Sequence, residues 1–183
     1  MAEYYLISQL PSLDGMDENS PVPITEKRFL ELCESTLKNK AMCELNNIKL
    51  IPSLDAKKSY SALIENFNEG ERNLRLALAK VRADKMNKPF DLQNRHLPSE
   101  LFKVASEAVE IKNPLEAEKF LLQYRLHFLE TIRPMDNFSE DYIFYYGLKL
   151  KLILRLKQFD VQVGKATYKN IYDSILRGDR LEA

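Results

Sequence analysis

The stretch that decides the fold runs from Asp141 to Asp160 and reads DYIFYYGLKLKLILRLKQFD. Between Leu148 and Leu156, leucines alternate with Lys, Ile and Arg. This two-residue period is typical of a strand with one solvent-exposed face. The same residues would also form a helix that is apolar on most sides and carries cations at its edges. The two interpretations predict different fold classes, so the flanking sequence has to decide between them.

Local signals favour the helix. Ser139, followed by Glu140 and Asp141, is typical of a helix start, because a serine oxygen caps the first N–H groups and acids suit the N-terminal end of the helix dipole. The run continues for about twenty residues without a turn signal, longer than an average strand, and leucine lacks the β-branch that strands prefer. We therefore predict a helix with one broad apolar sector, made of Tyr142, Tyr145, Tyr146, Leu150, Ile153 and Leu156 and widened by Leu148, Leu152 and Phe159.

The cations of this helix are Lys149, Lys151, Arg155 and Lys157. We expect them at the flanks, where long stems lie over apolar surface and the charged ends stay in water. Two interpretations stay open: a buried bundle helix with solvated cations, or a docking helix for an acidic partner.

The composition extends the helical prediction to the whole chain. Only five glycines occur in 183 residues, whereas an all-β protein needs turn glycines at short intervals. Leu, Lys, Glu, Ala and Arg dominate, and all are good helix formers. We predict an all-α fold, an irregular multi-helix bundle in one elongated or two-lobed domain.

Proline and capping signals suggest how the chain is divided. Residues 1–87 form a predicted N-terminal lobe with a long helix over 55–87, capped by Asp55. Residues 88–98, with a proline near each end, are the predicted linker, and 99–183 are the C-terminal lobe; alternatively the two lobes pack as one domain. Residues 3–10 fit either a strand or a helix.

Further helix ends are predicted from single residues. Thr25 and Ser99 are expected N-caps, and Asn113 followed by Pro114 is a strong helix start. A last helix is predicted over about 164–177, with Gly178 just past its end as a C-cap.

The long helix carries an apolar seam with steps of four and three residues, interrupted by Glu71. Gly70 lies beside the interruption and predicts a kink or a close packing contact, because a mid-helix glycine is otherwise unfavourable by about 1 kcal/mol. Arg72, Arg75 and Arg82 lie on one side of this helix, and Glu71 and Arg75 are spaced for an i,i+4 ion pair. The arginines form either a solvated, salt-bridged face or a ridge that contacts a partner.

Several classes of function are disfavoured. Lys and Arg number 27 and so do Asp and Glu, which argues against general nucleic-acid binding. The chain lacks a phosphate-binding glycine motif, so no cofactor is predicted. His96 and His127 lack metal-ligand spacing, so no metal is predicted, and the sequence has no recognisable nucleophile motif, so no catalytic residue is predicted.

The compartment is predicted from the cysteines and the apolar runs. Cys33 and Cys43 form neither a disulfide framework nor a metal knuckle, which fits a reduced cytosolic setting. No signal peptide is apparent, and no apolar run has the length that spans a bilayer, so direct membrane insertion is not expected.

Three stretches resemble a known family: YYLISQLPSL, NEGERNLRLALAKVRADK, and YYGLKLKLILRLKQFD with a following glycine. They are similar to an uncharacterised family of small bacterial proteins, encoded among the genes of V/A-type ATPases in Bacteroidetes and related groups. The resemblance covers nearly the whole chain, through patterns of apolar and basic residues.

The last two stretches also resemble the C-type subunit of archaeal ATPases, which has a d-type counterpart in eukaryotes. This all-helical protein, here called the rotor-cap subunit, caps the membrane rotor ring and receives the central shaft. The first set of matching residues is Glu71, Leu74, Arg75, Leu78, Ala79, Arg82 and Ala83, and the second is Tyr146, Lys149, Leu150 and Arg155. The chain is shorter than the rotor-cap subunit, so it holds only part of that three-repeat architecture.

The resemblance implies a non-catalytic coupling subunit that is cytoplasmic and associated with the inner membrane through a complex. Its implied partners are the other V/A-type ATPase subunits, namely the central shaft and the membrane rotor ring. Two alternatives remain: an assembly or regulatory factor for the same ATPase, and an unrelated helical enzyme. A deep pocket with convergent acids, or with His127 pointing into it, would favour the enzyme. The partner-binding candidates are Arg72, Arg75, Arg82, Tyr146, Lys149 and Arg155.

Overall fold

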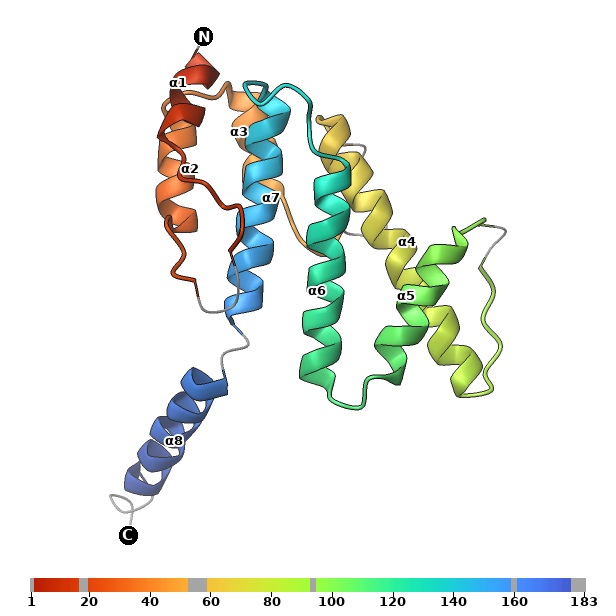
Figure 1. The fold of residues 1–183 in the computed structure, drawn as a ribbon. Helices are drawn as coiled ribbons and strands as arrows, with labels where there is room; N and C mark the ends of the chain where they lie inside the picture. The colour runs from red at the N-terminus through yellow and green to blue at the C-terminus, as the bar shows by residue number, and fades with distance from the viewer. Residues whose placement is uncertain (1, 17–19, 53–58, 93–94, 159–160, 179–183) are drawn as a thin grey trace.

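The computed structural model describes residues 2–16, 20–52, 59–92, 95–158 and 161–178. Within these ranges the chain forms helices and no strands, which confirms the all-α prediction. The eight helices are α1 (Ala2–Gln9), α2 (Glu26–Glu34), α3 (Asn39–Asn47), α4 (Ala62–Lys85), α5 (Ser99–Glu110), α6 (Pro114–Thr131), α7 (Glu140–Lys157) and α8 (Val161–Gly178). Figure 1 shows α1 to α3 on one side of α7, and α6, α4 and α5 on the other.

Residues 141–157 of this stretch lie in α7, the central helix of the bundle, and Phe159, which was predicted in its apolar sector, lies outside the described residues. The Ser139 hydroxyl accepts a hydrogen bond from the Tyr142 N–H at 3.3 Å, so the predicted cap is confirmed. The helix packs against α2, α3, α4 and α6. Its side chains from Ile143 to Leu150 are all buried, which explains why the apolar sector extends around most of the helix. The strand-like alternation in the sequence therefore reflects burial on several faces.

The buried side chains form two clusters, here called the α7 cluster and the α5 cluster. The α7 cluster joins α1, α2, α3 and α7 with the first turns of α4 and the later part of α6. The α5 cluster joins α5 with the second part of α4 and Leu121 of α6. Helices from both sides of the predicted linker 88–98 share each cluster, so the hydrophobic core does not divide at that segment.

Helix α4 is shorter at its N-terminal end than the prediction over 55–87. Ser61 caps it by accepting hydrogen bonds from the Leu63 and Ile64 N–H groups, and the same hydroxyl donates to Asp141 of α7 at 2.6 Å. The predicted cap, Asp55, lies outside the described residues. Because Ser61 satisfies the first N–H groups and fastens α4 to the start of α7, the helix begins there.

The close contact predicted at Gly70 is confirmed. A Cβ atom built on Gly70 would lie 2.3 Å from Cε1 of Phe128 on α6. The absence of a side chain therefore lets α4 and α6 approach closely at this point.

Other boundaries were predicted with mixed success. Thr25 accepts from the Arg28 N–H and Asn113 accepts from the Leu115 N–H, so both caps are confirmed. The Ser99 cap is wrong: Pro98 is the N-cap residue and Ser99 is the first helical residue of α5. The proline ring fixes φ in a range that suits this boundary. The N-terminal segment is helical, and α8 begins at Val161 and includes Gly178.

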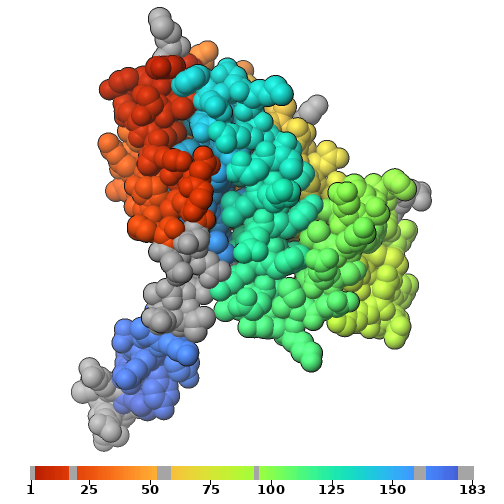
Figure 2. All heavy atoms as spheres, viewed as in Figure 1, coloured from red at the N-terminus to blue at the C-terminus, as the bar shows by residue number. Residues whose placement is uncertain are grey.

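Helix α8 lies apart from the bundle in the space-filling view (Figure 2). Its large apolar side chains share one face, at steps of three and four residues, and stay exposed: Tyr168, Ile171, Tyr172, Ile175 and Leu176. Among the parts of the chain that the structure places, no helix is both long and apolar enough to traverse a membrane.

Candidate partner-binding cleft

A cleft of about 560 Å³ opens between α4, α6, α7 and the segment that follows α3. Its apolar lining includes Leu122 of α6, Leu152 and Leu154 of α7, and Leu50 with Ile51 after α3. Ile51 is 62% exposed and Leu50 is half-buried. The cleft thus offers an apolar surface that the described chain leaves partly uncovered.

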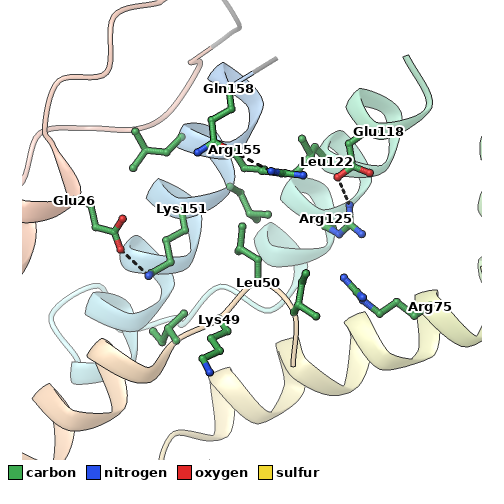
Figure 3. A pocket seen from close by; sticks show the side chains of 14 residues that line it. Glu26, Lys49, Leu50, Arg75, Glu118, Leu122, Arg125, Lys151, Arg155 and Gln158 are labelled. Atoms are coloured by element: carbon green, nitrogen blue, oxygen red, sulfur yellow. Dashed lines mark hydrogen bonds and ion pairs between the residues drawn. The ribbon is translucent and has the colours of Figure 1, made fainter. Parts of the chain in front are cut away.

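Five cations line the same cleft: Lys49, Arg75, Arg125, Lys151 and Arg155. Only two acids, Glu26 and Glu118, share the lining. Figure 3 shows Arg155 reaching from α7 toward Leu122 and Arg125 on α6, and Arg75 reaching from α4 toward Arg125. Side chains from three helices therefore bring guanidinium groups into the cleft.

Arg125 is neutralised within the chain. Its Nε donates to Glu71 Oε2 at 2.8 Å and its Nη2 donates to Glu71 Oε1 at 3.1 Å. A third, longer contact of 3.9 Å joins Arg125 Nη1 to Glu118 Oε1. The Arg125 side chain is only 11% exposed, so it fixes the wall of the cleft and offers little charge to a ligand.

The cations at the rim are more accessible. Arg75 donates through Nε to Glu71 at 2.7 Å, which confirms the predicted i,i+4 pair, and its side chain is 42% exposed. Arg155 and Lys49 are exposed, and Arg155 donates through Nη1 to the Gln158 side chain at 3.2 Å. Lys151 is paired with Glu26 at 2.7 Å on the opposite side. The rim therefore carries more positive than negative charge.

The six predicted partner-binding residues do not lie together. Arg75 and Arg155 line the cleft. Arg72 is paired with Glu65 at 2.8 Å, and Arg82 is exposed on a later turn of α4. The arginines of α4 are thus a mixture: a partly buried ion pair at Arg72, a cleft residue at Arg75 and a solvated residue at Arg82.

Tyr146 and Lys149 lie inside the bundle. The Tyr146 hydroxyl donates to the Pro11 carbonyl oxygen at 2.8 Å, and burial raises the pKa of this phenol. Lys149 is 7% exposed, and its Nζ contacts Asp14 Oδ1 and Glu130 Oε1, each at 2.6 Å. Lys149 was expected at a solvated flank, and that expectation is wrong, because acids from two other segments converge on its ammonium.

This ion cluster shifts the pKa values of its members. Burial alone would lower the pKa of Lys149, but the hydrogen bonds with Asp14, Glu130 and Tyr145 raise it overall. The hydrogen bond from Lys149 lowers the pKa of Asp14. Burial, reinforced by the bond to Glu130, raises the pKa of Tyr145 to about 12. At neutral pH these ion pairs link the N-terminal segment, α6 and α7.

A second hollow, of about 510 Å³, lies between α4, α6 and the start of α5. Its lining includes His127, Glu69 and Glu100, together with Tyr124 and Phe128. Within the described ranges, no three or more His, Cys, Asp and Glu side chains are grouped so that they would hold a metal ion. His127 therefore lines a hollow of mixed polar and apolar character, together with Glu69 and Glu100.

Sequence reasoning missed two cations of the cleft, Lys49 and Arg125. Arg125 carried a usable signal: it is the only Lys or Arg in the mostly apolar run 120–129, and Glu71 interrupts the apolar seam of α4. Two such interruptions are a reason to expect a buried pair. Lys49 carried no comparable signal, because only the fold brings the segment after α3 to the ends of α7 and α6.

Part of the chain matches a known family model. Residues 90–179, which contain α5, α6, α7 and α8, match the model described as "Protein of unknown function (DUF2764)". No curated protein and no solved structure matches the chain.

Proposed function

We propose that the protein is a non-catalytic helical subunit of a V/A-type proton- or sodium-translocating ATPase. In this role it couples the central shaft to the membrane rotor ring, in the manner of the rotor-cap subunit. The protein is cytoplasmic in this proposal and reaches the inner membrane only through the complex.

One observation carries the proposal. Arg75 and Arg155 belong to the two separate stretches that resemble the rotor-cap subunit, and they line the same cleft. A coupling protein needs a surface where another chain docks, and apolar area surrounded by arginines is typical of such surfaces. The rigid helices that hold both arginines suit a part that transmits torque.

The proposal is tested by purifying the tagged protein from its native cells at low salt and identifying the attached proteins by mass spectrometry. We expect shaft and membrane-sector subunits of the ATPase in fixed proportion to the tagged chain. Recovery of the protein alone, or with proteins unrelated to the ATPase, would contradict the proposal.

The stoichiometry in the same experiment separates two roles. A permanent subunit is present in the intact, active ATPase at a constant ratio to the other subunits. An assembly or regulatory factor is found mainly with incomplete complexes and is depleted from active ATPase.

A further inference from the structure

We propose that the cleft between α4, α6 and α7 binds an acidic amphipathic helix of a partner chain. The inference rests on the proposed role as a subunit that docks other subunits, and it names the chemistry of the docked segment. The partner helix would place leucine-like side chains on the floor of the cleft and Glu or Asp side chains against its rim.

The arrangement of charge favours a helix over a small anion. A small anion needs several donors that converge on one point, but the most buried cation of the cleft, Arg125, is already bound by Glu71 and Glu118. The accessible cations, Lys49, Arg75 and Arg155, instead lie on different walls around an apolar floor (Figure 3). Cations spread around an apolar groove are suited to the spaced carboxylates of a helix.

The apolar floor supplies the second half of the match. Leu122 of α6 and Leu152 of α7 form the buried base of the floor, while Leu154 is half-buried and Ile51 is 62% exposed. Helix-in-groove recognition relies on such a floor to receive side chains at i, i+3, i+4 and i+7 of the bound helix. Covering Ile51 and the half-buried Leu50 and Leu154 would remove apolar surface from water, which favours binding.

Helix α8 is a poor occupant for this cleft, although it has an exposed apolar face. Its described residues include Lys165 and Lys169 beside that face, against the single acid Asp173. A cationic helix would face the cations of the rim, and like charges disfavour such an interface. The occupant is therefore a different, acidic segment.

The test measures binding of a fluorescent peptide to the purified full chain by anisotropy. The peptide has about 18 residues, or five turns of helix, with Leu along one stripe and Glu on both flanks. A matched peptide carries Lys in place of every Glu. We expect the Glu peptide to bind, the Lys peptide not to bind, and the affinity to fall as salt rises from about 50 to 300 mM.

Variants locate the site. Arg155→Glu and Lys49→Glu, made separately and together, reverse exposed charges on the rim. Each should weaken binding of the Glu peptide, and the double variant should weaken it by about tenfold or more. Arg82→Glu makes the same change at an exposed site of α4 outside the cleft and should leave binding unchanged. Unchanged urea midpoints would show that the variants fold.

Three results would overturn the inference: no binding of the Glu peptide, equal binding of the two peptides, or equal binding by the wild type and the double variant. Displacement of the peptide by about millimolar inorganic phosphate would also overturn it, since the site would then be one for small anions. The peptide test is independent of the purification from cells. If the Glu peptide binds but no ATPase subunits are recovered from cells, only the proposed function is contradicted. If ATPase subunits are recovered but the Glu peptide does not bind, only the acidic-helix inference is contradicted.

Discussion

Glu71 of α4 and Arg125 of α6 are joined by two hydrogen bonds, of 2.8 and 3.1 Å, with side chains only 2% and 11% exposed. They are 54 residues apart in the sequence. The pair lies where the α7 cluster meets the α5 cluster, since Phe67 belongs to the first and Leu74 to the second. It therefore connects the two halves of the core and fixes Arg125 in the wall of the cleft.

Replacing Glu71 by Gln should destabilise the protein by about 3 kcal/mol, because it leaves the Arg125 charge largely buried without its main counterion. Urea unfolding followed by circular dichroism measures the loss. Glu69→Gln changes an exposed acid two residues away and should cost less than about 0.5 kcal/mol.

The double variant Glu71→Leu with Arg125→Leu checks the cause. Since neither charge remains buried, it should recover most of the loss. Equal losses for Glu71→Gln and Glu69→Gln would show that the pair contributes no stability.

Gly70→Ala should destabilise the protein by about 1 kcal/mol, although alanine favours helices. The new Cβ would lie 2.3 Å from Phe128 Cε1, and the cost of overpacking, about 1–3 kcal/mol, exceeds the gain in helix propensity of about 1 kcal/mol. In a Phe128→Leu background the contact is relieved, so the same substitution should become stabilising. Urea unfolding of the four proteins gives the coupling. If Gly70→Ala has the same effect in both backgrounds, Phe128 is not the cause.

The features predicted correctly from the sequence are those with local causes. The caps at Thr25, Asn113 and Ser139 depend on side chains within three residues of the N–H groups that they satisfy. The close contact at Gly70 was also predicted, since a glycine weakens a helix interior unless a neighbouring element needs the space. Its partner in that contact, Phe128, was not predicted, because it comes from a different helix.

The features that were missed depend on distant segments. Lys149 has the same neighbours in sequence as a solvated lysine, but Glu130 lies 19 residues away and Asp14 lies 135 residues away. The cleft likewise depends on the fold, which brings Arg75 of α4 and Arg155 of α7 to the lining of one cleft. The sequence pattern within one helix does not show which residues of another helix lie beside it.

Lys149→Met should make stability less dependent on acid pH. The folded-state pKa of Asp14 is lowered by its hydrogen bond with Lys149; for Glu130, burial raises the pKa, but the bonds from Lys149 and Tyr145 lower it overall. A lowered carboxyl pKa stabilises the fold above the unfolded value of about 4 and loses that effect as pH falls through the folded pKa. The variant lacks this contribution. The wild type should therefore exceed it most in free energy of unfolding near neutral pH, and the difference should shrink below about pH 4.

The measurement is the urea midpoint of each protein from neutral to acid pH, with Lys103→Met, at an exposed lysine, as the control. A difference that stays constant over this range would mean that Lys149 acts through packing alone. On the alkaline side, the raised pKa of Lys149 predicts that its contribution persists up to about pH 10 and is lost only at higher pH.

The two thiols should differ strongly in reactivity. Cys33 is fully buried, and burial raises its pKa to about 12, so almost no thiolate is present at neutral pH. Cys43 is exposed on α3. A disulfide reagent such as dithionitrobenzoate should therefore label Cys43 at least about 100-fold faster in the native protein. Cys43→Ser should remove the fast phase, and rapid labelling of that variant without denaturant would contradict the burial of Cys33.

Removal of α8 should leave the bundle intact. Its large apolar side chains are 47–71% exposed, so the helix contributes little to the free energy of unfolding of the rest. A chain ending at Gln158 should keep its thermal midpoint within about 2 °C and lose only helical signal in circular dichroism. Leu6→Ala in α1 is the contrast: Leu6 is 2% exposed in the α7 cluster, and its truncation should cost about 2–3 kcal/mol. A fall in the midpoint of more than about 5 °C on removing α8 would mean that the exposed stripe packs against the bundle in solution.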